Sequence, residues 1–235
     1  MRLWTLTLDL ADSFGDRDWV LVGGLMVQLH GFEREDEPRL TEDIDVLGEA
    51  RRSPRSTARL ARIIEERGGE VRMPPRSNEQ LGYRFELEGQ VIEVLGPDGL
   101  KADPPTLGKL TTLQIDGGRQ ALHRAETVLV VLGERPPAPI RRPDLLGAIL
   151  LKARVVAVKR PDKFDSDRED LIRLLTYVDD PRELAETGGL TRNERGWLRR
   201  VDPLLDFESQ AVETLISAQS LLRAQQTFEL LASPA

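Results

Sequence analysis

One sequence feature constrains the fold of this chain more than any other. It consists of two adjacent glycines after a short apolar run, followed further along the chain by two aspartates separated by one apolar residue. Trp19–Val22 is apolar and predicts a buried strand that ends at a tight turn, Gly23-Gly24. A helix is predicted from there to about His30, with Gly31 as its stop. The apolar residues that recur at helical spacing in this helix are Leu25, Met26, Leu29 and Phe32.

The segment Asp43–Leu47 predicts a second strand, because polar and apolar residues alternate strictly along it. Asp43 and Asp45 therefore lie on one face, where two carboxylates can bind Mg²⁺ or Mn²⁺ against the phosphates of a nucleotide. Gly23 and Gly24 allow a triphosphate to approach the backbone amides at the start of a helix. Together these features predict a metal-dependent nucleotide site.

Two stretches carry a resemblance to a known superfamily: Val22-Gly23-Gly24-Leu25-Met26, and Arg39 to Val46, which has the form Arg-x-Thr-x-Asp-x-Asp. They resemble the polymerase-β-like nucleotidyltransferases, and within that group the sequence is similar to the AbiEii/MenT-type toxins of bacterial toxin–antitoxin pairs. The resemblance implies that Gly23 and Gly24 bind the triphosphate of an NTP and that Asp43 and Asp45 bind the metal. It also implies that Arg39 and Thr41 support the nucleotide and metal loop, although packing is an equal explanation for both.

A second match to the same branch lies in the later part of the chain. Lys152-Ala153-Arg154 is followed by Arg160 and by Asp167-Arg168-Glu169-Asp170-Leu171. The resemblance implies that Lys152 contacts the β- and γ-phosphates, that Arg160 binds the nucleotide, and that Asp167 or Asp170 orients Lys152 or the ribose. A surface lysine and two helix-capping aspartates explain the same residues equally well.

Glu93 is the candidate for a third site carboxylate, as a metal ligand or as the base that activates the acceptor hydroxyl. It lies on the apolar run Val91–Leu95, which with Tyr83–Leu87 flanks Glu88-Gly89-Gln90 and predicts a hairpin. The branch that the sequence resembles commonly has aspartate here, and glutamate is one methylene longer.

The fold class expected is α+β, with an N-terminal nucleotidyltransferase-like mixed sheet flanked by helices and an all-helical C-terminal part. The predicted domains are 1–135 and 144–235, because Glu134–Pro143 contains four prolines and is typical of a linker. The other predicted strand is Val128–Leu132. The other predicted helices cover 3–14, Ser53 or Ser56 to Arg67, Asp144–Val158, and Asp165 or Asp167 to Tyr177.

The composition of the chain limits its possible binding partners and cellular location. The 235 residues carry a net charge of −7, which argues against nonspecific binding of long nucleic acid, although arginine and lysine clusters leave a local basic face open. The chain has no cysteine, which excludes disulfides and thiolate sites and favours a reducing cytoplasm. Neither a signal peptide nor an apolar stretch long enough to span a membrane is expected.

The leading functional hypothesis is an enzyme that transfers a nucleoside monophosphate from an NTP to an acceptor hydroxyl. The resemblance implies an RNA acceptor, such as a tRNA 3′ end, or a protein acceptor, and a growth-inhibiting toxin with an antitoxin partner. One alternative is a nucleotidyltransferase fold with altered chemistry that serves as a binding or sensor module. Another is a small-molecule transferase of the kind that modifies antibiotics.

Overall fold

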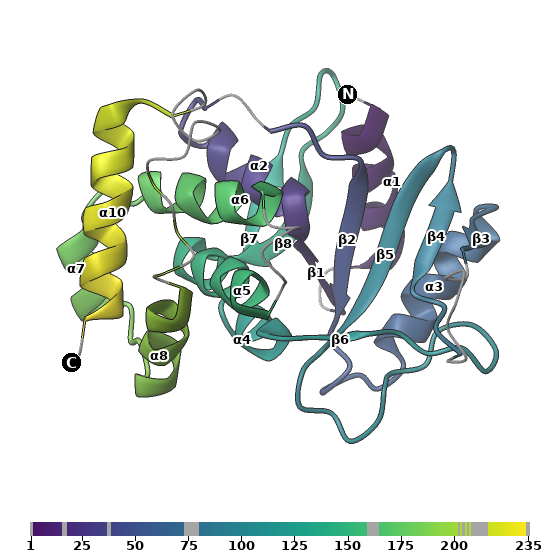
Figure 1. Ribbon diagram of the computed structural model, residues 1–235. Coiled ribbons are helices and arrows are strands. Elements are labelled where there is room, and N and C mark those ends of the chain that lie inside the picture. The colour runs from purple at the N-terminus through teal and green to yellow at the C-terminus, as the bar shows by residue number, and fades with distance from the viewer. Residues whose placement is uncertain are drawn as a thin grey trace. The chain divides into compact units, whose positions relative to one another are not determined.

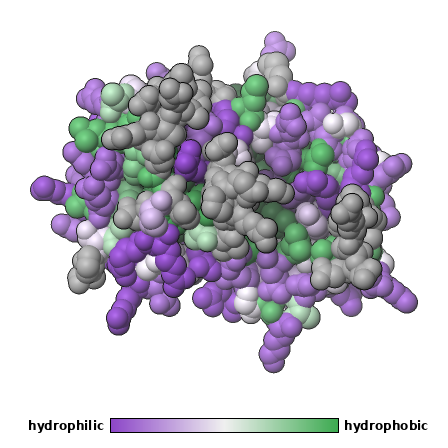
Figure 2. Space-filling view, viewed as in Figure 1, coloured by the Kyte–Doolittle hydropathy of each residue, from purple (hydrophilic) through white to green (hydrophobic). Residues whose placement is uncertain are grey.

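The computed structural model describes residues 2–15, 18–36, 39–72, 80–158, 165–201, 203, 205, 207 and 216–233. They form two compact units, one made of Met1–Gln28 and Arg39–Asp144, the other of Leu29–Pro38 and Leu145–Ala235. The first unit combines helices with a mixed sheet and the second is helical, which confirms the predicted fold class. The face seen in Figure 2 is mostly hydrophilic, in keeping with a charged fraction of 31%.

The first unit holds the sheet. Its helices are α1 (Arg2–Phe14), the start of α2 (Gly23–Phe32), α3 (Ser56–Glu66) and α4 (Gly118–His123). Its strands are β1 (Trp19–Val22), β2 (Asp43–Gly48), β3 (Glu70–Val71), β4 (Arg84–Leu87), β5 (Gln90–Pro97), β6 (Gln114–Ile115), β7 (Ala125–Val130) and β8 (Ala138–Pro143). The strand order is β1-β2-β5-β4-β3, and β6 pairs with the end of β5. Strands β2 and β5 are parallel, whereas β1 and β4 run antiparallel to their neighbours β2 and β5.

The alternation of residues along the central strands gives the sheet a buried face and a charged face. Ile44 and Val46 of β2 and Ile92 and Val94 of β5 are almost completely buried. Helices α1 and α3 cover this face (Figure 1), and α3 contacts both strands. The intervening charged residues of β2 and β5 are only partly buried, so the sheet keeps its acidic side chains on the face opposite these two helices.

The hairpin of β4 and β5 forms where the sequence predicts it. Glu88 and Gly89 both have positive φ, at 53° and 75°, as a two-residue type I′ turn requires. This turn sets a register in which Arg84 pairs with Glu93. Because Phe85 and Leu87 are buried, the register is also held by packing.

The predicted linker at 134–143 is wrong. Ala138–Pro143 forms β8, which pairs along its whole length with β7 and contacts β1 and α1. Its prolines are compatible with this position because, among the described residues, β8 pairs with β7 alone, so part of its backbone needs no N–H donor for a ladder. The first unit consequently extends to Asp144.

The second unit contains the last residues of α2 and the helices that follow the sheet. These are α5 (Leu145–Val158), α6 (Asp165–Thr176), α7 (Pro181–Thr187), α8 (Arg192–Val201) and α10 (Ala218–Ala232). Helix α5 contacts α6 and α8, and α10 contacts α6, α7 and α8. Helix α2 continues one residue past Gly31, the predicted stop, to Phe32. A Cβ on Gly31 would lie 3.0 Å from the Tyr177 hydroxyl, so glycine allows this part of α2 to lie close to Tyr177, the residue that follows α6.

Candidate functional site

The Gly23-Gly24 turn lies directly against the second aspartate of the Asp-x-Asp pair. Gly23 has φ +66°, in the left-handed region that favours glycine. A Cβ added to Gly23 would overlap the carboxylate of Asp45. Strands β1 and β2 produce this contact, because Val22, the residue before the turn, pairs with Asp45. The glycine turn and the Asp-x-Asp pair, which the sequence separates, are therefore in contact in the fold.

The segment before β2 lies against the second glycine. A Cβ on Gly24 would lie 2.6 Å from the Thr41 hydroxyl oxygen and 3.1 Å from a guanidinium nitrogen of Arg39. The Thr41 hydroxyl donates a hydrogen bond to Asp43 Oδ1 at 2.9 Å. Thr41 therefore connects the glycine turn to the first aspartate, and Arg39 brings a cation to the same turn.

A buried relay that the sequence pattern does not reveal holds Arg39 in place. The Trp4 indole N–H donates to Gln28 Oε1 at 2.9 Å, and the Gln28 amide N–H donates to the carbonyl of Arg39. Trp4 and Gln28 are both buried. The only signal in the sequence is a glutamine on the otherwise apolar part of α2, and its partners are 24 and 11 residues away.

Glu93 lies on the strand next to the aspartates and faces the same way. In the parallel pair of β2 and β5, Asp45 is opposite Glu93, so their side chains leave the same face of the sheet. Both Nε and Nη2 of Arg84 donate to Glu93 Oε1, at 2.8 and 2.5 Å. This bond and the charge of Glu93 raise the pKa of Arg84, with a smaller contribution from the charge of Asp43. Arg84 was not predicted as a site residue, although the two-residue hairpin turn places it opposite Glu93.

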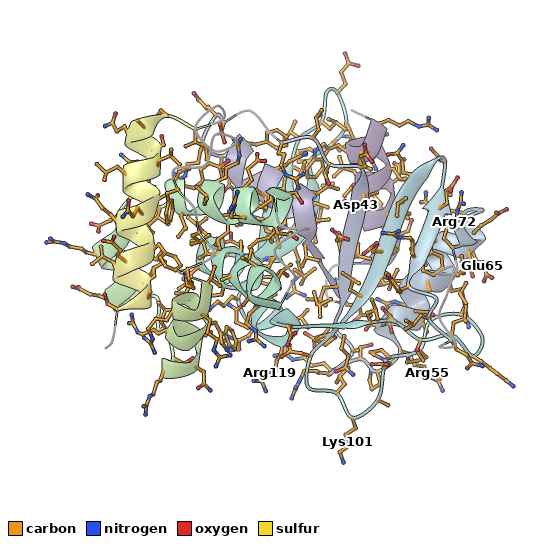
Figure 3. The ribbon with its side chains drawn as sticks, viewed as in Figure 1. Asp43, Arg55, Glu65, Arg72, Lys101 and Arg119 are labelled. Atoms are coloured by element: carbon orange, nitrogen blue, oxygen red, sulfur yellow. The ribbon has the colours of Figure 1, made fainter. Side chains whose placement is uncertain are left out.

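Asp43 and Asp45 fit the ligand requirements of Mg²⁺, which is usually held by one or two carboxylates and by the oxygens of substrate phosphates. Figure 3 labels Asp43 on β2. Among the residues that the structure describes, no three histidine, cysteine, aspartate or glutamate side chains converge as a metal site.

The residues of the second predicted motif meet inside the helical unit. The Lys152 ammonium lies 2.9 Å from Asp167 Oδ1 and 2.8 Å from Asp170 Oδ2, and all three residues are buried. Burial lowers the pKa of Lys152, but the carboxylates of Asp170 and Asp167 outweigh it and raise the pKa above its ordinary value. Both aspartates lie within α6 rather than capping it. Arg160 lies outside the described residues.

A second charged cluster joins the turn that follows α2 to the C-terminal end of α6 and the residue after it. The carboxylate oxygen Oδ2 of Asp36 accepts hydrogen bonds from Arg173 Nη1 and from the Tyr177 hydroxyl, each at 2.5 Å. Burial and the bond to Asp36 raise the pKa of Tyr177 far above its ordinary range. This cluster explains why Leu29–Pro38 belongs to the helical unit, a grouping that local sequence patterns do not indicate.

Within the described part of the chain, no helix is long and apolar enough to cross a bilayer. Neither the family models nor the curated proteins with which the chain was compared match it.

Proposed function

We propose that this chain is a metal-dependent nucleotidyltransferase, which transfers a nucleoside monophosphate from an NTP to an acceptor hydroxyl. One observation carries the proposal: the carboxylate of Asp45 occupies the space that any side chain at Gly23 would need. The strand-to-helix turn that the sequence predicts for phosphate binding is therefore in contact with a carboxylate suited to Mg²⁺. The sheet order, with β1 antiparallel and β5 parallel to β2, supports the resemblance to the polymerase-β-like superfamily.

In this proposal the protein positions the nucleotide and balances its charge. Gly23 and Gly24 begin α2, and because the first amides of a helix have no partner within it, these two would bind the triphosphate. Asp43 and Asp45 would hold Mg²⁺, and the chemistry that a bound Mg²⁺ would supply is neutralisation of phosphate charge and polarisation of the α-phosphate. Arg39 adds a permanent positive charge at the same turn.

The transfer step needs few groups from the protein. The acceptor oxygen attacks the α-phosphorus, the bond from that phosphorus to the oxygen leading to the β-phosphate breaks, and pyrophosphate leaves. The hydroxyl proton passes to Glu93, through the oxygen that Arg84 does not contact. Correct placement of the acceptor supplies most of the remaining rate.

For the biological role we propose the toxin of a toxin–antitoxin pair, with an RNA end or a protein as acceptor and an antitoxin as partner. The resemblance of the Arg39–Val46 segment to the AbiEii/MenT-type branch supports this role. The absence of cysteine from the sequence supports the cytoplasm as its location. Lys152, enclosed by Asp167 and Asp170, stays a predicted phosphate ligand of this scheme.

A binding or sensor module is the second candidate, and the Arg84–Glu93 pair favours it. A carboxylate that already accepts two hydrogen bonds from a guanidinium is a poorer metal ligand than a free one. A module of this kind would bind NTP with Mg²⁺ and release it unchanged. It would keep its biological effect when Asp45 is replaced by asparagine.

A transfer assay separates these functions. Purified protein is incubated with Mg²⁺, each α-³²P-labelled NTP and total cellular RNA, beside the Asp43→Asn/Asp45→Asn protein. Label on an RNA species with wild type only supports the RNA transferase, and label on a polypeptide moves the acceptor to protein. If neither RNA, protein nor an added aminoglycoside gains label while Mg²⁺-dependent NTP binding persists, the transferase proposal fails and the module is favoured.

Replacing Gly23 by alanine is expected to reduce nucleotidyl transfer by roughly a hundredfold, because displaced catalytic groups cost about that much. The new Cβ would displace the Asp45 carboxylate. Gly68→Ala is the matched control: its φ is also positive, at +89°, but no atom lies within 4 Å of the added Cβ. Both variants should lose about 1–2 kcal/mol of stability from backbone strain. If steady-state rates of Gly23→Ala and Gly68→Ala are equal, Gly23 does not position Asp45.

A further inference from the structure

Arg84 places a fixed positive charge within the acidic face of the sheet. Asp45, Glu93 and Arg84 lie opposite one another on β2, β5 and β4, so they form a row across three adjacent strands. Neighbouring strands are about 4.8 Å apart, and side chains in such a row leave the sheet on one face. Arg84 thus reaches Glu93 from the side opposite to Asp45.

The structure holds Arg84 in this position through its backbone. The two-residue turn at Glu88-Gly89 sets the hairpin register, and the buried side chains of Phe85 and Leu87 prevent β4 from slipping. Two guanidinium nitrogens then engage one oxygen of Glu93. Both bonds go to Oε1, so Oε2 is the oxygen that takes the proton in the proposed transfer.

The pairing of Glu93 with Arg84 argues for one divalent ion rather than two. Asp43, Asp45 and Glu93 bring three negative charges to the site, and the charge of Arg84 offsets that of Glu93, the residue it binds. Two ions about 4 Å apart repel each other and need carboxylates to bridge or flank them. The carboxylate that would flank the second ion, on the side of the acceptor, is Glu93, and Arg84 already binds it.

We propose that Arg84 takes the place of a second metal ion: it holds Glu93 out of metal coordination and limits the site to one divalent cation, bound by Asp43 and Asp45. This inference rests on the proposed function, because it concerns the same site. Glu93 then serves as the base and not as a metal ligand. Arg84 is a positioning residue, since it acts through Glu93.

Electron paramagnetic resonance of bound Mn²⁺ tests the inference without any assay of activity. Protein is saturated with Mn²⁺ and a non-hydrolysable NTP analogue, and unbound ions are removed by gel filtration. Wild type should hold one Mn²⁺ per chain with the spectrum of an isolated ion. Arg84→Met should hold two, with the exchange-coupled spectrum of a close pair. Arg84→Lys, which keeps the charge, should hold one.

Arg72→Met is the matched control, because Arg72 is also exposed and also paired to a glutamate, Glu86 (Arg72 is labelled in Figure 3). Arg72 follows β3, which is one strand further from β2 and its aspartates than β4 is. It should bind one Mn²⁺, as wild type does. Two coupled ions in wild type, or a single ion in a folded Arg84→Met protein, would overturn the inference.

Glu93→Gln keeps the test decisive if Arg84→Met does not fold. Since Glu93 is not a ligand in this proposal, the variant should bind Mn²⁺ within about threefold of the wild-type affinity, whereas removal of a ligand carboxylate weakens binding tenfold or more. A tenfold or larger loss of Mn²⁺ affinity in Glu93→Gln would overturn the inference and leave the proposed function intact. A wild-type protein that binds no Mn²⁺ with any analogue would overturn the proposed function itself.

Discussion

The Asp45→Asn protein is expected to fold normally and to lose nucleotidyl transfer by roughly a thousandfold or more. Asparagine has nearly the shape of aspartate, so the contact with the Gly23 turn is kept. The lost negative charge is the one that holds Mg²⁺ against the triphosphate, and a metal contributes several kcal/mol to a transition state of this kind. A loss of about 4 kcal/mol corresponds to roughly three powers of ten in rate.

The measurement is the initial rate of label transfer at saturating NTP, together with the thermal midpoint of each protein. Glu42→Gln is the matched control, because it removes one negative charge from the same segment at an exposed position beside Asp43. Its rate should stay within about twofold of wild type, since exposed charges act weakly. An Asp45→Asn protein with wild-type activity would show that Asp45 is not a metal ligand.

The Lys152→Met protein is expected to lose about 3–5 kcal/mol of stability. Lys152 is 5% exposed and lies between Asp167 and Asp170, so its removal takes one positive charge away from two buried carboxylates. Urea unfolding followed by circular dichroism measures the loss. Replacing both aspartates by asparagine in the Lys152→Met background should restore part of it, because no buried charge then remains.

Lys101→Met is the control for the loss of a lysine, because Lys101 is exposed on a loop of the first unit (labelled in Figure 3). Its effect should stay within about 0.5 kcal/mol. If Lys152→Met were as stable as this control, the ion cluster would not stabilise the helical unit. The expected loss is independent of any contact of Lys152 with phosphate.

The stabilising effect of Lys152 also has a defined pH range. The pKa of Lys152 is raised in the folded protein. Its contribution is therefore fully present below the unfolded value of about 10.4 and is lost as the pH rises through the higher folded pKa. The difference in unfolding free energy between wild type and Lys152→Met should stay constant from pH 7 to pH 10 and shrink above it. A difference that falls already between pH 7 and pH 9 would contradict the raised pKa.

Local patterns in the sequence predict the part of the site that consecutive residues encode. The alternation of Asp43–Leu47 predicts β2 and the common face of its two aspartates, and Gly23-Gly24 predicts the end of β1. The hairpin predicted around Glu88-Gly89 is formed by β4 and β5. Its register sets the face of the sheet on which Glu93 lies. These features depend on backbone periodicity and turn geometry, which act over a few residues.

The parts that were not predicted depend on partners far apart in the sequence. Proline content favoured a linker at 134–143, but pairing with β7 forms β8. The grouping of Leu29–Pro38 with the helical unit depends on Asp36, whose partners Arg173 and Tyr177 are 137 and 141 residues away. The pairing of Lys152 with both aspartates likewise needs the packing of α5 on α6.

The most direct test of a magnesium–nucleotide site at the Gly23 turn is calorimetric titration of the protein with a non-hydrolysable NTP analogue, with Mg²⁺ and with EDTA. We expect binding with Mg²⁺, binding at least tenfold weaker with EDTA, and the same weak binding for Asp43→Asn/Asp45→Asn whether or not Mg²⁺ is present. Binding that is equally tight with EDTA, or that the double substitution leaves unchanged, would contradict the site. So would the absence of binding by wild type for all four nucleotides.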